Sequence, residues 1–585
     1  MFKREEAAIE AKIFEYLKTQ GIEDPVFEFR QIPFSGEWGI AVPLFPVAAS
    51  EARSGKKVIV PKRAQELAED IKTDLGKLPA GFSHVEAVNG YLNFYFSTSQ
   101  FAQRVVNTVL GDGVEYGRGA IRHQTVMVEY SQPNTHKSFH VGHLRNVILG
   151  GSVCRILAFS GFDVIRANYV GDIGLHVVKW MWNYLKNHSG EEPDVNKTHW
   201  MNDIYAEADR LFQDPENEAA VRELYARWNA QDPEVVALWK KTRQWSLEGF
   251  EQIYELLGED FDQIYFESEV EVSGTTLVEE MIEKGIAQDE RPEGPVFIDL
   301  DALVGTENEY RVLVVLRSDG SSLYATKDLP LAIQKFEDFN LDKSIYVIDA
   351  RQSLYMKQIF KALEILGYGW ADKLYHLAYE LVNLPGNVTM ASREGTVVLF
   401  DDLVLEATHR AREIVEEKNP EATEAIKDDI AQAVALGALK YTMLSRDNTK
   451  VVTFDWDAAL DFNGQAAPYI QYAHVRAGSI LRKAGEEFPG KADFPDDLEK
   501  AEINLIELMT RLPGEVQRAS EEYRPLIIAN LAYDLAKAFN DFYNTCHVLN
   551  AEPPVRAYRL RLVAAAKQVI ATSLGLLGIK APLMM

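Results

Sequence analysis

Apolar and polar residues between positions 125 and 169 follow patterns that predict a strand, a long helix and a second strand. Residues 125–130 form a short apolar run rich in β-branched side chains, which is typical of a buried strand. Apolar residues then recur at helical spacing from Leu144 to Leu157, and Phe159-Ser-Gly161 predicts the end of that helix. Residues 163–169 predict the second strand. In such a unit, a ligand binds beyond the carboxyl end of the first strand.

Residues 1–118 carry a mixed pattern that predicts a separate α+β domain. Ile9, Ile13 and Leu17 repeat at the spacing of an amphipathic helix. Strands are expected at 27–33, 38–42, 84–88 and 91–96, and a further helix at 64–75. Glycines between residues 111 and 119 predict a linker to the next domain.

Residues 175–257 have a helical pattern and predict an insertion rich in aromatic side chains. Its tryptophans are more typical of a core than of base-stacking platforms, because large aromatic residues are usually buried; they are Trp180, Trp182, Trp200, Trp228, Trp239 and Trp245. Strands are then expected at 296–300, 310–316, 344–349 and 373–380, with helices at 326–336 and 354–366. This order predicts a sheet in two halves separated by the insertion.

The last third of the chain is predicted to be helical. Residues 401–465 predict a helical linker, and residues 466–585 a bundle. Its five expected helices, each with an apolar face, lie at 468–484, 499–512, 513–519, 524–545 and 555–576. The predicted fold class is therefore α/β: a split Rossmann-type catalytic domain at 119–400, an N-terminal α+β domain at 1–118 and a C-terminal all-α bundle.

Candidate chemistry concentrates where the helix after the first strand begins, at His140-Val-Gly-His143. Unpaired N–H groups and the positive end of the helix dipole make a helix start an anion site, and Gly142 leaves room for a ligand. His140 and His143, three residues apart, can both donate hydrogen bonds to phosphate oxygens. Neither common glycine-rich nucleotide motif is present, so this is a phosphate site of another kind.

Two other interpretations of these histidines are weighed. His136, His140 and His143 could bind a metal, but no cysteine or acidic residue lies beside them, and the H-E-x-x-H pattern is absent. The two histidines at the helix start could also simply cap the helix.

Composition restricts the class of protein and its surroundings. The 585 residues are 47% hydrophobic and 25% charged, and no apolar run approaches the roughly 18 residues of a membrane span. Cys154 and Cys546 are the only cysteines, which excludes a disulfide scaffold and fits a cytoplasmic location. A net charge of −27 disfavours a nucleic-acid partner, although residues 466–585 hold 14 basic and 14 acidic side chains. Composition therefore leaves RNA binding open.

Residues 133–143 resemble the HIGH signature of class I aminoacyl-tRNA synthetases, in the form found in arginyl-tRNA synthetases. Residues 168–174, 323–328, 375–385 and 467–476 resemble further blocks of that family in the family's order, so the resemblance runs almost end to end. It implies ATP-dependent activation of L-arginine to arginyl-adenylate and transfer to the 3′-terminal ribose of tRNA(Arg). ATP with Mg²⁺ is then a substrate, no tightly bound metal, DNA or membrane partner is expected, and the chain is expected to be a monomer.

The resemblance also implies roles for particular residues. Catalysis is assigned to His140, Gly142, His143, Lys137 and Arg393, and arginine binding to Glu129, Asn134, Tyr324, Asp328 and Gln352. ATP binding is assigned to Ser131, Pro133, Thr135, His140, His143, Met390 and Ser392, and tRNA binding to Tyr469, Gln471, Tyr472 and Arg476. The residue types assigned to arginine binding also fit this role without the resemblance, because carboxylates and amide oxygens are the best partners for the planar guanidinium group.

Two of the implied tRNA contacts have equal alternatives. The N-terminal domain touches the tRNA elbow in the family, but a scaffolding role fits its residues as well. The aromatic and polar face of helix 468–484 could stack on unpaired bases or pack against the catalytic domain.

One loop departs from the family pattern. The family's Lys-Met-Ser-type motif falls at residues 387–395, where Thr389 takes the lysine position, Ala391 the serine position and Glu394 a basic position. Lys137 is expected to supply the missing ammonium group from the other side of the phosphates.

Two rival functions are considered. Another class I synthetase, such as the cysteinyl one, is opposed by the absence of Cys/His zinc ligands and by the acidic pocket. A non-catalytic RNA-binding relative is supported only by Thr389.

Overall fold

The computed structural model describes residues 3–23, 25–193, 197–384, 388–389, 398–485 and 489–585. The chain forms two compact units. One comprises 1–116, 473–512 and 534–570, and the other 117–472, 513–533 and 571–585. The boundaries of these two units differ from those of the four expected domains. The division into four domains stays a prediction.

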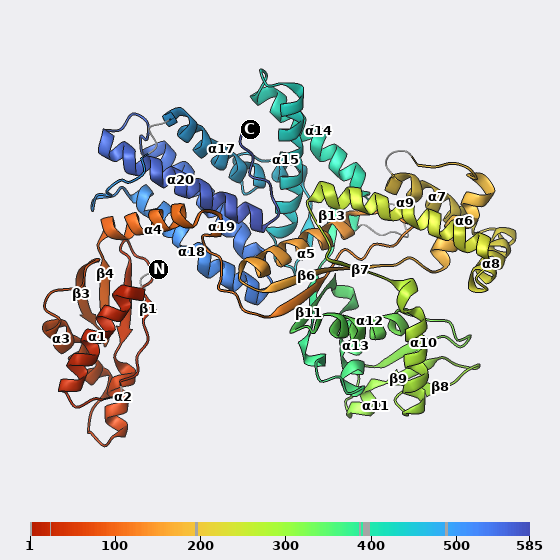
Figure 1. Cartoon of the computed structure of the whole chain (residues 1–585), viewed down its shortest axis with the longest axis horizontal. Helices are drawn as coiled ribbons and strands as arrows, with labels where there is room; N and C mark the ends of the chain where they lie inside the picture. Colours follow the sequence, from red (N-terminus) through yellow and green to blue (C-terminus); the bar gives the residue numbers. More distant parts are fainter. Residues whose placement is uncertain (1–2, 24, 194–196, 385–387, 390–397, 486–488) are drawn as a thin grey trace. The chain divides into compact units, whose positions relative to one another are not determined.

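The N-terminal segment is an antiparallel sheet covered by helices, as predicted (Figure 1). The strands are β1 (Arg30–Gln31), β2 (Gly39–Pro43), β3 (Phe82–Val88) and β4 (Tyr91–Phe96), in the order β1-β2-β4-β3. The helices are α1 (Lys3–Thr19), α2 (Phe45–Arg53), α3 (Val60–Asp74) and α4 (Thr98–Asp112). Ile9, Ile13 and Leu17 of α1 are fully buried, which confirms the predicted apolar face. The expected strand at 27–33 is only two residues long, and α2 and α4 were not predicted.

The catalytic sheet has five parallel strands in the order β12-β11-β5-β6-β7. They are β5 (Thr125–Glu129), β6 (Asp163–Val170), β7 (Gln263–Phe266), β11 (Lys343–Asp349) and β12 (Leu374–Tyr379). α5 (Val141–Phe159) joins β5 to β6, so the strand–helix–strand unit is confirmed. Val126, Met127 and Val128 of β5 are buried, because a central parallel strand is covered on both faces. The short strand β7 was not predicted.

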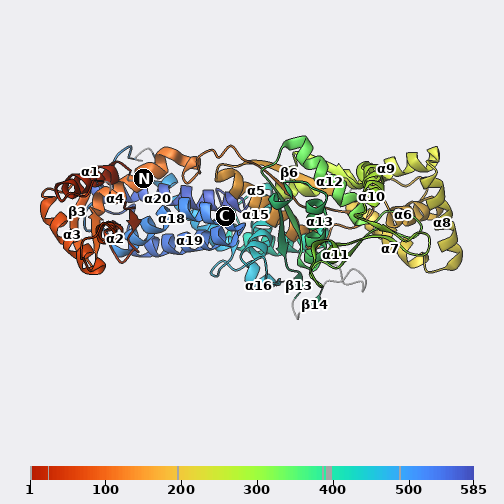
Figure 2. The same ribbon diagram turned by 90° about the horizontal axis from the view of Figure 1, so that it is seen from below.

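The insertion after β6 is helical, as expected, and its helices group together in both views (Figures 1 and 2). They are α6 (Leu175–Asn187), α7 (Lys197–Leu211), α8 (Pro215–Asn229) and α9 (Pro233–Leu257). Trp180, Trp182, Trp228 and Trp245 are buried in one apolar cluster, and Trp200 and Trp239 pack against it. Their predicted role as core residues is therefore confirmed.

The strands expected at 296–300 and 310–316 do not join the catalytic sheet, so that part of the two-halved sheet is wrong. They form β9 (Val296–Asp299) and β10 (Val312–Leu316), which pair antiparallel and, with β8 (Gln288–Asp289), make a separate sheet. An apolar run predicts a strand but not its partner, which tertiary packing decides. The remaining helices here are α10 (Glu267–Glu283), α11 (Leu300–Val304), α12 (Tyr324–Phe339) and α13 (Ser353–Ile365).

Helices dominate beyond residue 400. α14 (Phe400–Lys418), α15 (Glu424–Leu444) and α16 (Trp456–Ala459) accompany a small sheet of β13 (Val382–Leu384), β14 (Val388–Thr389) and β15 (Val452–Thr453). The C-terminal helices are α17 (Ala467–Ala484), α18 (Lys500–Glu522), α19 (Leu526–Thr545) and α20 (Pro553–Leu576). Among the described residues, no helix has both the length and the apolar composition that crossing a membrane requires.

The predicted break before Pro513 is wrong, because α18 runs through it. A proline inside a helix leaves the carbonyl four residues earlier without its usual N–H donor. That carbonyl belongs to Met509, and it accepts a hydrogen bond from the hydroxyl of buried Tyr116 at 3.1 Å. The tyrosine hydroxyl therefore replaces the donor that Pro513 lacks.

Candidate active site

His140 and His143 form a reciprocal cap at the start of α5. The Nδ1 of His140 accepts the backbone N–H of Gly142 at 3.1 Å and of His143 at 3.4 Å. The Nδ1 of His143 accepts the backbone N–H of His140 at 3.3 Å. Since each neutral ring uses Nδ1 as an acceptor, its hydrogen lies on Nε2. The capping interpretation is confirmed, and it leaves one N–H donor on each imidazole.

The expected cradle of unpaired backbone N–H groups is wrong. Besides Gly142 and His143, Val141 donates its N–H to the carbonyl oxygen of Val398 at 3.2 Å, and Leu144 donates to His140 at 3.0 Å. An added Cβ at Gly142 would lie 2.9 Å from Cε1 of His140. The glycine therefore makes room for the imidazole ring, and the donors at this helix start are the Nε2–H groups.

Both imidazoles are neutral. Burial lowers the pKa of His140 to about 4; a backbone hydrogen bond opposes this shift and the nearby Lys137 ammonium contributes to it. Burial also holds the pKa of His143 well below its ordinary value. The pair can therefore donate hydrogen bonds at neutral pH, but it carries no positive charge.

His136 and Lys137, just before this cap, have different surroundings. His136 is fully buried, its ring nitrogens lie 3.0 Å from Thr135 Oγ1 and 2.8 Å from Thr242 Oγ1, and burial lowers its pKa to about 3. It is therefore a packed structural residue. Lys137 is half-buried, with Nζ 5.5 Å from the ring centre of Tyr205, and burial lowers its pKa. In the described part of the chain, no group of three His, Cys, Asp or Glu side chains could hold a metal ion.

A cluster of buried charges extends from the carboxyl end of β5 to α12. Glu129 forms an ion pair with fully buried Lys335 and accepts a hydrogen bond from Gln132 Nε2 at 2.8 Å. Glu267 and Lys327, also buried, form a second ion pair at 2.8 Å.

Asp328 is the carboxylate of this cluster that has no lysine of its own. It accepts a hydrogen bond from the hydroxyl of Tyr355 at 2.5 Å. Burial raises the pKa of Asp328 to about 7; the Tyr355 hydrogen bond opposes this shift, and the charges of Glu129 and Glu267 contribute to it. Three acidic side chains thus face two lysines, and the cluster lacks one positive charge.

Tyr169 of β6 is a neutral member of this cluster. Its buried hydroxyl has no hydrogen-bond partner. Burial holds its pKa well above the ordinary value, and the nearby charges of Asp328, Glu267 and Glu129 act in the same direction. An unpaired buried hydroxyl beside excess acid is a donor available to a ligand.

Glu129 and Asp328 were predicted from the sequence, but the other members of the cluster were not; they are Tyr169, Glu267, Lys327, Lys335 and Tyr355. A signal existed for Lys335, because Asp328 and a residue seven positions later lie on the same helix face. Glu267 and Tyr355 come from other helices, α10 and α13, and no spacing in the sequence links them to Asp328.

The remaining expected substrate residues have mixed environments. Asn134 is half-buried and bridges to Gly171, whereas Gln352 and Tyr324 are exposed, the latter by 68%. Ser131, Pro133 and Thr135 are buried; Ser131 Oγ lies 2.7 Å from the Tyr254 hydroxyl, and Thr135 Oγ1 donates to the Gly171 carbonyl at 3.3 Å. Met390, Ser392 and Arg393, with Ala391 and Glu394, lie outside the described residues.

Segments before residue 385 and after residue 397 form hydrogen bonds with residues at or near the start of α5. Arg145 donates to the carbonyl oxygens of Leu381 at 2.8 Å and Lys450 at 2.9 Å, and burial lowers its pKa to about 10. On the other side, Phe400 donates its N–H to the carbonyl of Phe139 at 2.9 Å.

The four expected tRNA contacts on α17 differ in their surroundings. Tyr469 and Tyr472 are half-buried, and the ring of Tyr469 lies 5.6 Å from that of Tyr533. Arg476 donates to Asn540 Oδ1 at 2.5 Å. Gln471 needs correction: it is fully buried, and its amide donates to the carbonyls of Ala433 at 3.0 Å and Lys580 at 2.9 Å. The side chain of Gln471 therefore has a structural role and is not accessible to tRNA.

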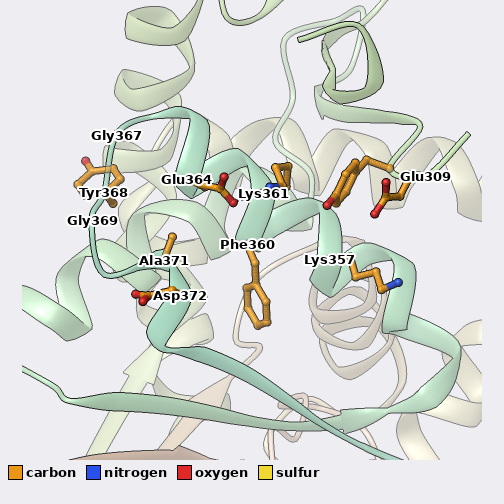
Figure 3. Close-up of a pocket in the computed structure, with 11 residues that line it drawn as sticks. Glu309, Lys357, Phe360, Lys361, Glu364, Gly367, Tyr368, Gly369, Ala371 and Asp372 are labelled. Carbon is orange, nitrogen blue, oxygen red and sulfur yellow. Dashed lines mark hydrogen bonds and ion pairs between the residues drawn. The ribbon is translucent and has the colours of Figure 1, made fainter. Parts of the chain in front are cut away.

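A groove of about 470 Å³ lies beside α13, and none of the predicted site residues is part of its lining (Figure 3). Its lining is Glu309, Tyr310, Lys357, Phe360, Lys361, Glu364, Gly367, Tyr368, Gly369, Ala371 and Asp372. Lys361 of this lining donates a hydrogen bond to Glu364 at 2.6 Å.

The parallel sheet with its capped imidazole pair lies within a stretch that matches the class I aminoacyl-tRNA synthetases, and this is the class of protein to which the chain belongs. The family model of the catalytic domain of class I (R) tRNA synthetases matches residues 105–456, and that of the DALR anticodon binding domain matches residues 470–585. The chain belongs to the arginyl-tRNA synthetases. It joins arginine to tRNA(Arg) in a reaction that consumes ATP.

Relatives support this assignment along the whole chain. The arginine–tRNA ligase of Bacteroides thetaiotaomicron is 36% identical over 548 residues, which cover 89% of this chain and 90% of that protein. That of Clostridium botulinum is 33% identical over 562 residues, covering 95% and 96%. The structure of Thermus thermophilus arginyl-tRNA synthetase has a TM-score of 0.75 and 29% identity, with 100% of both chains covered.

Proposed function

We propose that arginine binds in the acidic cluster beside Asp328 and that ATP binds against the imidazoles of His140 and His143. One observation carries the arginine assignment. The carboxylates of buried Glu129 and Glu267 and of half-buried Asp328 outnumber by one the two lysines of the cluster. A substrate guanidinium group would supply the missing charge, and burying an unmatched charge is costly without such a partner.

Within this cluster, Asp328 is the principal partner of the guanidinium. Glu129 and Glu267 are already paired with lysines, whereas Asp328 has only the Tyr355 hydroxyl. Asn134, Tyr324 and Gln352 complete the site in this proposal. Lysine lacks the planar fork that a carboxylate can meet with two parallel bonds, and a neutral head group would leave Asp328 unpaired.

In the activation step, a carboxylate oxygen of arginine attacks the α-phosphorus of ATP. The new bond forms arginyl-adenylate, the bond from this phosphorus to the bridging oxygen breaks, and pyrophosphate leaves with its electrons. The Nε2–H groups of His140 and His143 donate hydrogen bonds to phosphate oxygens, while Lys137 and the Mg²⁺ ion of the substrate neutralise charge. Thr389 stands where the family has a loop lysine, and Lys137 performs the role of that lysine. A ribose hydroxyl at the tRNA 3′ end then attacks the adenylate carbonyl and releases AMP.

Other expectations belong to the same proposal. Tyr469, Tyr472 and Arg476 of α17 contact tRNA, because aromatic and guanidinium groups bind unpaired bases. The N-terminal segment adds a further tRNA contact. The protein acts as a monomer in the cytoplasm, and Arg393, Met390 and Ser392 assist ATP binding.

Exchange of labelled pyrophosphate into ATP, measured with each of the twenty amino acids and with or without tRNA, tests the proposal. Exchange is expected with arginine alone. Asp328→Asn is expected to raise the KM for arginine by at least about tenfold and to leave the KM for ATP within about twofold, since one ion pair is lost. Equal effects on both constants would move the arginine pocket elsewhere. Full tRNA affinity without exchange would favour a non-catalytic protein.

A further inference from the structure

Two consecutive residues directly after β5 have a left-handed backbone. Ser131 has a φ of 77° and Gln132 a φ of 50°, and neither is glycine. A Cβ atom disfavours this conformation, so two such residues in succession persist only where their surroundings hold them. The turn lies between Glu129 and Asn134, at the edge of the sheet where substrates are proposed to bind.

The side chains of two asparagines hold this turn. Asn146 Oδ1 accepts the backbone N–H of Ser131 at 2.6 Å, and Asn168 Oδ1 accepts the backbone N–H of Gln132 at 3.1 Å. Asn146 comes from α5 and Asn168 from β6, and both are buried, at 3% and 1% exposure. Each donor of the strained turn therefore has one dedicated acceptor.

Both asparagines are themselves fixed in orientation. Asn146 Nδ2 donates to the carbonyl of Val347 in β11 at 2.7 Å. Asn168 Nδ2 donates to the hydroxyl of Tyr254 at 3.0 Å, and that hydroxyl lies 2.7 Å from Ser131 Oγ. Because a backbone N–H must meet an oxygen and a carbonyl must meet an NH₂ group, neither amide of this network can be turned around.

The conformation of this turn also determines the orientation of Glu129, which is a proposed arginine contact. The side chain of Gln132 donates from Nε2 to Glu129 Oε1 at 2.8 Å. If the backbone of Gln132 relaxed to an ordinary conformation, that amide would leave Glu129. On the far side of the turn, Pro133 accepts the N–H of Gly171 at 3.0 Å, so relaxation would also shift the segment that carries Asn134.

We infer that Asn146 and Asn168 are positioning residues, which hold the Ser131–Gln132 turn in its left-handed form so that Glu129 and Asn134 reach arginine. This inference rests on the proposed arginine site. It assigns a function in substrate binding to side chains that touch no substrate themselves.

Asn168 allows a matched pair of variants. Asn168→Asp keeps an oxygen for the N–H of Gln132, and the Tyr254 hydroxyl can rotate to donate to the new carboxylate. Asn168→Leu has a similar shape but accepts no hydrogen bond. We expect Asn168→Leu and Asn146→Leu to raise the arginine KM in pyrophosphate exchange by at least about tenfold, with the ATP KM within about twofold. Asn168→Asp is expected to keep the arginine KM within about threefold of the parent value.

A glycine in the turn gives an independent test. Ser131→Gly removes the conformational penalty at φ 77°. Added to Asn146→Leu, it is expected to restore at least about half of the lost arginine affinity on a logarithmic scale, which a general loss of packing would not show. If Asn168→Leu does not fold, Asn168→Ser replaces it, since its hydroxyl is too short to reach the same N–H, and the same rise is expected.

The outcomes separate this inference from the proposed site. If Asp328→Asn raises the arginine KM but neither leucine variant does, the positioning role is overturned. It is also overturned if the leucine variants raise both KM values equally. If Asp328→Asn changes nothing, the arginine site itself is misplaced, whatever the asparagine variants do.

Discussion

The imidazoles of His140 and His143 stack with ring centroids 3.9 Å apart, and each Nδ1 accepts the backbone N–H of the other residue. Hydrogen bonding thus fixes the tautomer of both rings before any substrate arrives. Preorganised donors of this kind stabilise developing charge without reorganisation during the reaction. The structural cap and the proposed phosphate donor are two sides of the same side chain.

This division within one ring can be tested at His143 with two amides. His143→Asn puts an oxygen near the Nδ1 position and keeps the cap but has no donor near Nε2. When the His143→Gln amide lies at the Nε2 position, the backbone N–H of His140 loses the acceptor that His143 Nδ1 provides. We expect His143→Asn to lower kcat of pyrophosphate exchange by about 10²–10³-fold, with little change in Tm. We expect His143→Gln to keep more activity but to lose about 1 kcal/mol of stability. The reverse order of the two activities would contradict the assigned tautomer.

Lys137 is expected to supply the ammonium group that Thr389 cannot. Its side chain is half-buried, and burial lowers its pKa, so its charge is poorly solvated and ready for a phosphate partner. Lys137→Ala should lower kcat of exchange by at least about tenfold. Tyr205→Phe keeps the ring beside Lys137 and serves as the control, with kcat unchanged. An unaffected Lys137→Ala enzyme would remove the compensation hypothesis.

On α17, neighbouring residues are expected to differ in what they do. Tyr472→Ala should weaken tRNA binding and leave arginine affinity unchanged, because its ring is proposed to contact bases. Gln471→Ala should lower the free energy of unfolding by about 1–3 kcal/mol, since two buried carbonyls lose their donor. Filter binding of tRNA and chemical denaturation measure the two effects. Equal losses of tRNA affinity would mean that α17 acts only through its packing.

The sequence predicted elements more reliably than their partners. The β5–α5–β6 unit follows directly from apolar spacing, and the helices of the insertion do as well. By contrast, β9 and β10 were assigned to the wrong sheet, because an apolar run carries no information about which strand it meets. Within α18, the carbonyl that Pro513 leaves without a helical donor is satisfied by the hydroxyl of Tyr116, which lies 393 residues away in sequence.

The candidate site shows the same limit. His140, His143, Glu129 and Asp328 could be found because motif blocks mark them. Their electrostatic state could not, since it depends on Lys335 and Glu267 and on burial. The sequence also could not show that the two imidazoles accept the backbone N–H groups at the start of α5. The spacing of the histidines is compatible with both a free helix start and a capped one.

The pH dependence of arginine binding is expected to follow Asp328. Burial raises its pKa from 3.8 to about 7, with Glu129 and Glu267 raising it and the Tyr355 hydroxyl and Lys335 opposing. A carboxyl group whose pKa is higher in the folded state favours folding fully below about pH 4, and this contribution is lost as the pH rises through about 7. Arginine pairs with the ionised form, so its KM should fall as the pH rises from 6 to 8, and binding at pH 6 should release protons.

The increase in Tm caused by arginine should be larger at pH 8 than at pH 6, because the ligand then matches a charge that otherwise destabilises the fold. Calorimetry in buffers of different ionisation enthalpy measures the protons released, and Asp328→Asn should abolish this release. A KM for arginine that stays constant between pH 6 and 8 would place the titrating carboxyl group outside the arginine site.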